Sequence, residues 1–118
     1  MNNIISMNIR GPGADPKFLA LKELFRSSNS KIILIQETMH GCHDSISYFR
    51  RMLPSWHMAA TDASGLSGGL EVLWDPVWIY AMAFSCFVGI LLLAYIRGST
   101  GPFHILNIYA PYKERLPF

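Results

Sequence analysis

The chain has 118 residues, of which 51% are hydrophobic, enough apolar material for one small domain with a buried core, and this excludes a disordered tail. Its net charge of +2, from ten Lys and Arg against eight Asp and Glu, is too small to indicate nucleic-acid binding by itself. The two cysteines, Cys42 and Cys86, match no zinc or redox spacing, so we expect reduced thiols.

The front of the chain predicts a strand, a turn and a helix. Residues 3–10 form a short, largely apolar run that Gly11-Pro12-Gly13 closes, which is typical of a strand followed by a turn. Asp15 is a suitable N-cap and Pro16 suits the first helical position, so we expect a helix to begin there. Apolar side chains then recur at three- and four-residue intervals and predict one buried face, made of Phe18, Leu21, Leu24 and Phe25.

The next segment predicts a strand that is covered on both faces. Residues 31–38 contain Ile32-Ile-Leu-Ile35 without polar alternation, which is the pattern of a fully buried strand. Gln36, Glu37 and Thr38 follow at its carboxyl end, where polar side chains are placed for a site. A shorter helix is predicted from Asp44 to Leu53, because Pro54 would end it.

Further strands are predicted over residues 56–60, 70–74 and 103–109, with a loop over 64–69. The last of them alternates, with one side made of Phe103, Ile105, Asn107 and Tyr109 and the other of His104, Leu106 and Ile108. The order of strand, helix, strand, helix and then several strands predicts an α/β fold in which helices cover a mixed sheet. We expect residues 1–118 to belong to one domain.

Residues 76–96 contain no charged residue and end in the apolar run Val88-Gly-Ile-Leu-Leu-Leu-Ala-Tyr-Ile96. Two interpretations are open. Frequent β-branched and aromatic residues, with Gly89 in the middle, favour two consecutive buried strands. The length of the segment, with aromatic residues near its ends, would also suit a single membrane-spanning helix.

Four short motifs resemble, in order and separation, the first motifs of the endonuclease/exonuclease/phosphatase superfamily. They are Ile5-Ser-Met-Asn-Ile-Arg-Gly11, Ile35-Gln-Glu-Thr38, Ser67-Gly-Gly-Leu70 and Asn107-Ile-Tyr-Ala-Pro111. The segment Gly68-Gly-Leu-Glu-Val-Leu-Trp-Asp75 most resembles the corresponding sequence in the endonucleases of plant LINE-type retrotransposons. This resemblance implies part of a four-layered α/β sandwich that catalyses Mg²⁺-dependent hydrolysis of DNA phosphodiesters.

The resemblance also implies roles for three residues. Glu37 matches the family's metal-binding glutamate, and Asn8 matches an asparagine that helps to position the metal and the phosphate. Tyr109 matches a tyrosine whose hydroxyl contacts the scissile phosphate or assists the chemistry. Taken alone, Glu37 would be a solvated strand end and Tyr109 an edge aromatic, so these roles depend on the surrounding motifs.

The sequence also departs from the family's pattern. Met7 stands where the family usually has a tryptophan, and Tyr112 replaces the asparagine that commonly follows the proline. The sequence contains neither the Gly-Asp-Phe-Asn type motif nor the Ser-Asp-His motif, which orient and deprotonate the attacking water in the family. The resemblance therefore covers about the first half of the family's domain, and we expect the chain by itself to lack nuclease activity.

Three metal-capable side chains lie close together at His40, Cys42 and His43. Their spacing is too tight for a tetrahedral zinc site and no second cluster accompanies them, so we expect a polar loop.

The expected partners follow from these interpretations. The resemblance implies DNA as partner and Mg²⁺ as cofactor, in the nucleus or cytoplasm. Half of a sandwich would leave one sheet face open, which predicts self-association. The alternative interpretation of residues 76–96 would instead predict a membrane anchor.

Overall fold

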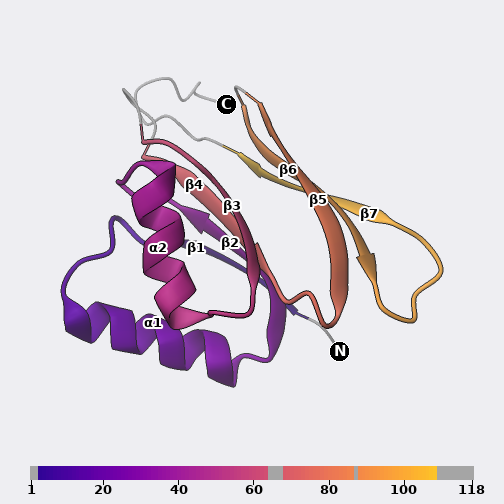
Figure 1. Cartoon of the computed structure of the whole chain (residues 1–118), viewed down its shortest axis with the longest axis horizontal. Helices are drawn as coiled ribbons and strands as arrows, with labels where there is room; N and C mark the ends of the chain where they lie inside the picture. The colour runs from indigo at the N-terminus through magenta and orange to yellow at the C-terminus, as the bar shows by residue number, and fades with distance from the viewer. Residues whose placement is uncertain (1–2, 64–67, 87, 109–118) are drawn as a thin grey trace, which may run out of the picture.

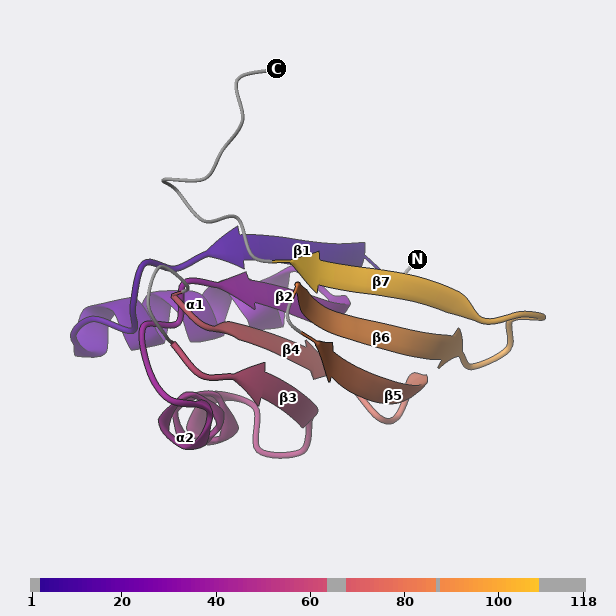
Figure 2. The same cartoon turned by 90° about the horizontal axis from the view of Figure 1, so that it is seen from above.

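Two sheets packed face to face, with helices on the outer side of the first sheet, make up the fold (Figures 1 and 2). This computed structural model describes residues 3–63, 68–86 and 88–108, and these residues form two helices and seven strands. The layers therefore run helices, four-stranded sheet, three-stranded sheet. The predicted α/β class is confirmed.

The first sheet has the strand order β1-β2-β4-β3, with bounds β1 Asn3–Asn8, β2 Ser30–Gln36, β3 His57–Thr61 and β4 Leu70–Trp74. β1 and β2 are parallel, and helix α1 (Asp15–Ser27) forms the crossover between them. β4 runs antiparallel to both of its neighbours, so the sheet is mixed. The central strands β2 and β4 are buried on both faces. The continuous apolar run Ile32–Ile35 predicts this for β2, whereas β4 also buries Glu71.

The second sheet is an antiparallel meander of β5 (Ile79–Cys86), β6 (Gly89–Ile96) and β7 (Phe103–Ile108). Residues 76–96 thus supply two consecutive strands, as the first interpretation predicts. The single-span interpretation is not favoured, since neither helix in the described part of the chain is long and apolar enough to cross a membrane. The expectation that both strands are fully buried is wrong for β5, because its side chains alternate between the core and an open outer face.

The inner face of the second sheet packs on the first sheet and closes the larger apolar core. Alternate residues of β5 and β6 meet the inner faces of β2 and β4 there, and the buried members are Ile32, Leu34, Leu70, Val72, Trp74, Ile79, Ile90, Leu92 and Ala94. Period-two alternation brings these side chains to one face of each strand, so both sheets bury one face in common.

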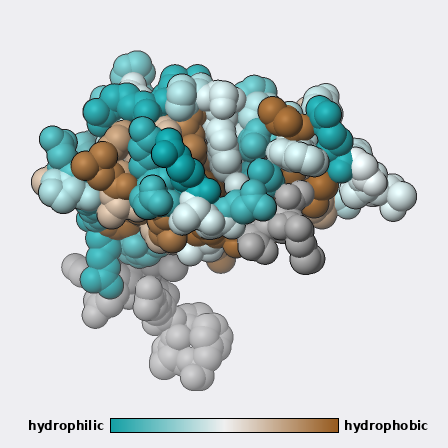
Figure 3. Space-filling model, turned by 90° about the horizontal axis from the view of Figure 1, so that it is seen from below, coloured by the Kyte–Doolittle hydropathy of each residue, from teal (hydrophilic) through white to brown (hydrophobic). Residues whose placement is uncertain are grey.

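The two helices close a second core on the other face of the first sheet. Leu21 and Phe25 of α1 are buried there with Phe49 and Met52 of helix α2 (Cys42–Met52). Leu24, predicted to be buried, is 39% exposed. Leu21 and Phe25 are four residues apart and lie at the centre of the helix face that contacts the sheet, whereas Leu24 lies at its edge. The view onto α1 from below shows mostly hydrophilic residues with hydrophobic ones among them (Figure 3).

Both helices begin differently from the sequence prediction. Ala14 is the N-cap of α1, and Asp15 lies in the first turn, where its charge favours the helix dipole. α2 begins at Cys42 rather than at Asp44 because Asp62, twenty residues away, accepts the Cys42 N–H at 2.6 Å. A cap supplied by a distant segment leaves no local sequence signal.

A glutamic acid is buried between α2 and the first sheet. Glu71 of β4 has no exposed surface, and one of its carboxyl oxygens accepts the hydroxyl of Ser45 of α2. Its other oxygen, Oε2, has no hydrogen-bond partner among the described residues. Burial raises the pKa of Glu71 from an ordinary 4.5 to about 8, against the opposing effects of the Ser45 hydrogen bond and the charge of Arg50.

This shifted pKa predicts that stability falls as the pH rises. Between about pH 4.5 and about pH 8 the folded state binds the Glu71 proton that the unfolded state has released. The free energy of unfolding should therefore fall across this window by on the order of 1 kcal/mol per pH unit. Glu71→Gln keeps the shape and removes the titration, so urea denaturation of the variant should show a much flatter pH profile.

The difference between the two profiles isolates Glu71, because all other titrating groups are shared. Glu23→Gln, on the exposed side of α1, is the matched control and should reproduce the wild-type profile. Parallel profiles for wild type and Glu71→Gln would contradict the prediction.

Candidate metal and phosphate site at the ends of β1 and β2

The parallel pairing of β1 and β2 brings two predicted site residues to one edge of the first sheet. Asn8 is the last residue of β1 and pairs with Gln36, the last residue of β2, so Glu37 lies directly beyond the pair. The pairing continues past the strands, since Ile9 N donates to Gln36 O at 3.1 Å and Gly11 N donates to Glu37 O at 2.8 Å. The segments that follow both strands are therefore fixed to each other.

The side chains of Asn8 and Glu37 contact each other directly. Asn8 Nδ2 donates to Glu37 Oε2, and Asn8 Oδ1 accepts the Arg10 N–H at 3.1 Å. Asn8 thus turns its amine toward the carboxylate and its carbonyl toward the backbone. In this arrangement Asn8 orients Glu37, and its predicted role as a metal ligand would require the amide to turn over.

Two glycines make room for Glu37 and Thr38. A Cβ added to Gly68 would lie 2.9 Å from Glu37 Cα and 3.0 Å from Glu37 Cγ. A Cβ added to Gly69, whose φ is +87°, would lie 2.3 Å from Thr38 Oγ1. The backbone of this Gly-Gly pair also accepts hydrogen bonds from the amides of Thr38 and Met39. Gly68 and Gly69, the two residues before β4, therefore pack directly against the site.

Glu37 itself has a left-handed backbone, with φ of +53°. A non-glycine residue in this region costs on the order of 1 kcal/mol, and such residues persist where the surroundings fix them. Here the fixing contacts are the Gly11 hydrogen bond on one side and the close approach of Gly68 on the other. The Glu37 side chain is half-buried and accepts a hydrogen bond from Asn8.

A lysine holds the loop that follows β1. Lys17, in the first turns of α1, donates from Nζ to Gly11 O at 2.7 Å and also to Ile9 O. Because Gly11 N is bonded to Glu37 O, the lysine stabilises the same loop that positions Glu37. The sequence did not indicate that Lys17 bonds to this loop, because a lysine at this position is typical of a solvated helix face.

A polar link beneath the site joins the two sheets. Gln36 Nε2 donates to Ser6 Oγ of β1 and to Asn107 Oδ1 of β7, each at 3.0 Å. Sequence reasoning missed the structural role of Asn107. Its position in the alternating strand could have indicated this role. Asn107 lies on the same side of the strand as the apolar residues Phe103 and Ile105, and a polar residue on a core-facing side needs hydrogen-bond partners.

The remaining sequence candidates are Tyr109 and the segment 40–43. Tyr109 lies outside the described residues. Of the three candidates in the 40–43 segment, Cys42 begins α2, and a hydrogen bond from its thiol to Asp62 raises the pKa of that thiol. No group of three or more His, Cys, Asp or Glu side chains within residues 3–63, 68–86 and 88–108 is arranged to hold a metal ion.

The donor set at this edge is compatible with a hard, oxygen-binding cation. Glu37 offers a single carboxylate, a hard oxygen ligand, beside a neutral amide. Mg²⁺ accepts this arrangement because it commonly binds through one or two carboxylates and keeps several of its waters or takes phosphate oxygens. A softer ion that needs several nitrogen or sulfur ligands would not be satisfied by this pair.

Comparison with known proteins identifies the fold. No family model matches the sequence, and no curated protein matches it. Among solved structures, humanized D. rerio TDP2 with 14 mutations is similar, with a TM-score of 0.55 at 12% sequence identity. The match covers 80% of this chain and 42% of that chain, so this chain spans less than half the length of TDP2. TDP2 has the endonuclease/exonuclease/phosphatase fold, and this chain has part of that fold.

The packing of Gly68 against Glu37 gives a direct prediction. Gly68→Ala places a methyl group within 3.0 Å of the Glu37 backbone, so one of the two segments must move. We expect a loss of roughly 1–3 kcal/mol in the free energy of unfolding and a changed NMR signal of the Asn8 side-chain amide. Gly101→Ala is the control, because no atom lies within 4 Å of the added Cβ. Equal behaviour of the two variants would refute the packing argument.

Proposed function

We propose that this chain is part of a Mg²⁺-dependent phosphodiesterase-type domain in which Glu37 binds the metal ion and DNA is the substrate of the whole domain. We further propose that the domain is related to the endonucleases of plant LINE-type retrotransposons. The single observation that carries the proposal is the hydrogen-bonded pair of Asn8 and Glu37 at the adjacent ends of two parallel strands. The TDP2-like fold supports the nuclease-type part of the proposal.

The chemistry of the pair supports this function. When bound at Glu37, Mg²⁺ would neutralise the negative charge of a phosphate and polarise its oxygens. Glu37 is held for that task by the Asn8 amine and by the Gly11 N–H. The Asn8 amine can donate equally well to a phosphate oxygen, since its two hydrogens allow two partners. In this proposal the hydroxyl of Tyr109 contacts the same phosphate.

We propose that the 118-residue chain by itself binds the cation without cleaving DNA. Hydrolysis requires a general base within hydrogen-bond reach of the attacking water. The sequence has neither of the two motifs that supply such groups in the family it resembles. In the described part of the chain, moreover, no cluster of acidic and histidine side chains accompanies Glu37.

Replacing Glu37 should abolish cation binding at this edge. Glu37→Gln keeps the shape and the contact with Asn8 but removes the charge that attracts Mg²⁺. We expect wild type to bind Mg²⁺ with millimolar affinity and the variant at least about tenfold more weakly, as one lost carboxylate ligand implies. An NMR titration that follows the backbone amides of Gly11 and Thr38 would measure both affinities.

Glu23→Gln removes an exposed carboxylate of α1 and should bind Mg²⁺ like wild type. Unchanged Mg²⁺ affinity in Glu37→Gln would rule out the proposed ligand. A second experiment tests the same proteins for nicking of supercoiled DNA in the presence of Mg²⁺. We expect no cleavage by wild type. Robust nicking that disappears in Glu37→Ala would show that the chain is an active enzyme and overturn the proposed inactivity.

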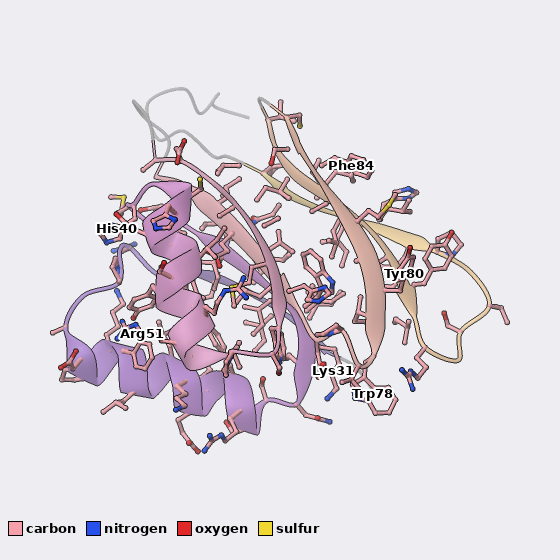
Figure 4. All side chains as sticks on the ribbon, in the orientation of Figure 1. Lys31, His40, Arg51, Trp78, Tyr80 and Phe84 are labelled. Carbon is pink, nitrogen blue, oxygen red and sulfur yellow. The ribbon has the colours of Figure 1, made fainter. Side chains whose placement is uncertain are left out.

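We also propose that two copies of the chain associate through the outer face of the second sheet. The outward side chains of β5, β6 and β7 include no Asp, Glu, Lys or Arg, so two copies would not repel each other there. Six large apolar or aromatic residues on this face are each 44% to 71% exposed, namely Tyr80, Met82, Phe84, Tyr95, Leu106 and Ile108. Tyr80 and Phe84 project from β5 away from the helices (Figure 4).

The size of this face supports the same proposal. From these exposed fractions, the six residues present roughly 600 Å² of surface, at the upper end of the size of the largest apolar patch on a soluble monomer. A stable interface buries about 800 Å² per partner, so the patch and its rim are large enough for a modest dimer.

Charges placed on the outer face should separate the copies. The double change Phe84→Glu and Leu106→Glu would bring like charges together in the proposed dimer, and we expect its dissociation constant to rise at least about tenfold. Sedimentation velocity at micromolar concentration, with circular dichroism to check folding, would measure this. Leu19→Glu, at a 62% exposed position on α1, is the control and should leave association unchanged. A wild-type chain that remains monomeric at about 100 µM would disprove association through this face.

A further inference from the structure

Asn107 is a buried polar residue in an otherwise apolar layer between the sheets. It is 3% exposed and lies on the inner face of β7, where Phe103 and Ile105 pack against the core. Its amide is fully committed to the first sheet. Nδ2 donates to Ile35 O at 3.0 Å and to Glu71 O at 3.1 Å, and Oδ1 accepts from Gln36 at 3.0 Å.

These three bonds span the two central strands of the first sheet. Ile35 of β2 and Glu71 of β4 are register partners, so the Asn107 amine bridges a single rung of that sheet. A shift of the second sheet by one residue would leave the buried amide without these partners. Because an unpaired buried amide is costly, the three bonds select one placement of β7 on the first sheet.

Gln36 connects this bridge to the Asn8 and Glu37 pair. It is the register partner of Asn8 and the residue before Glu37, and its backbone oxygen accepts the Ile9 N–H. Its side-chain amide nitrogen, Nε2, donates one hydrogen bond to Asn107 of β7 and another to Ser6 of β1. A change at Asn107 therefore reaches the end of β2 through a side chain that lies one residue from the candidate metal ligand.

We propose that Asn107 is a positioning residue that couples the docking of the second sheet to the geometry of the Asn8 and Glu37 pair, acting through Gln36. The inference rests on the proposed function insofar as this pair binds a cation. The coupling itself can be measured without a metal. Under this proposal, loosening β7 lowers the cation affinity of a site to which β7 contributes no ligand in the described residues.

Two variants break the link at different points. Asn107→Leu keeps the branched shape of the side chain and removes all three hydrogen bonds, whereas Gln36→Met leaves the bonds of Asn107 to the β2 and β4 backbone in place. Ile105→Val perturbs the same layer without touching an amide and is the packing control. Ser6→Ala removes only the other partner of Gln36.

The readouts are the NMR signal of the Asn8 side-chain amide and the hydrogen exchange of the Gly11 amide, which is bonded to Glu37 O. In Asn107→Leu and Gln36→Met we expect a shifted Asn8 signal, Gly11 exchange at least about tenfold faster than in Ile105→Val at matched stability, and Mg²⁺ affinity about threefold to tenfold lower. The double variant should be no more affected at Gly11 than Asn107→Leu, because both changes break one link.

The outcomes separate the two proposals. If both variants leave the Asn8 signal and Gly11 exchange as in Ile105→Val, the coupling is disproved, whatever the metal does. If wild type binds no Mg²⁺ but the variants still alter these two readouts, the coupling stands and the proposed function fails. If Asn107→Leu does not fold, Gln36→Met alone decides, because it keeps the bridge between the sheets intact.

Discussion

Because β1 and β2 run parallel, the residues that end them must meet at one edge of the first sheet, and the proposed cation site depends on that meeting. The crossover helix α1 enforces the parallel arrangement, and it also supplies Lys17, whose ammonium group bonds to the loop after β1. The site therefore does not rest on one hydrogen bond between Asn8 and Glu37. It rests on a frame in which the same loop is tied to both strands and to the helix between them.

Two buried polar side chains show how the layers are held in one arrangement. Glu71 faces the helices and bonds to Ser45 of α2, while Asn107 faces the first sheet from the other side and bonds to the backbone of β2 and β4. Apolar contacts alone would tolerate several placements of one layer on another, since they are not directional. Hydrogen bonds from buried groups are directional and costly to lose, so they favour a single placement. Asn107 also accepts a hydrogen bond from Gln36, the residue before Glu37, and this bond links the placement of the second sheet to the candidate site.

The outer face of the second sheet is open to solvent in the described part of the chain. The first sheet is covered on both faces, by helices and by the second sheet, whereas β5 leaves Tyr80, Met82 and Phe84 in solvent. The chain corresponds to 42% of the TDP2 structure that it resembles. Burying that face would stabilise the molecule by the usual hydrophobic gain, which is the physical reason for expecting a partner on it.

Much of the fold could be predicted from the sequence, because period and turn chemistry are local. The alternation of residues 103–108, the continuous apolar run of 32–35 and the Pro-initiated helix at 16 each determined an element, and the two-strand interpretation of residues 76–96 is confirmed. The motifs around Asn8 and Glu37 indicated that these two residues belong to one site. The contacts between distant segments could not be predicted and are known from the three-dimensional structure alone. They are the cap of α2 by Asp62, the packing of Gly68 on Glu37, and the hydrogen bonds of Asn107 to the first sheet. These contacts join residues 20 to 72 positions apart. They depend on how the helices and the two sheets pack on one another, and a local pattern of residue types does not indicate this packing.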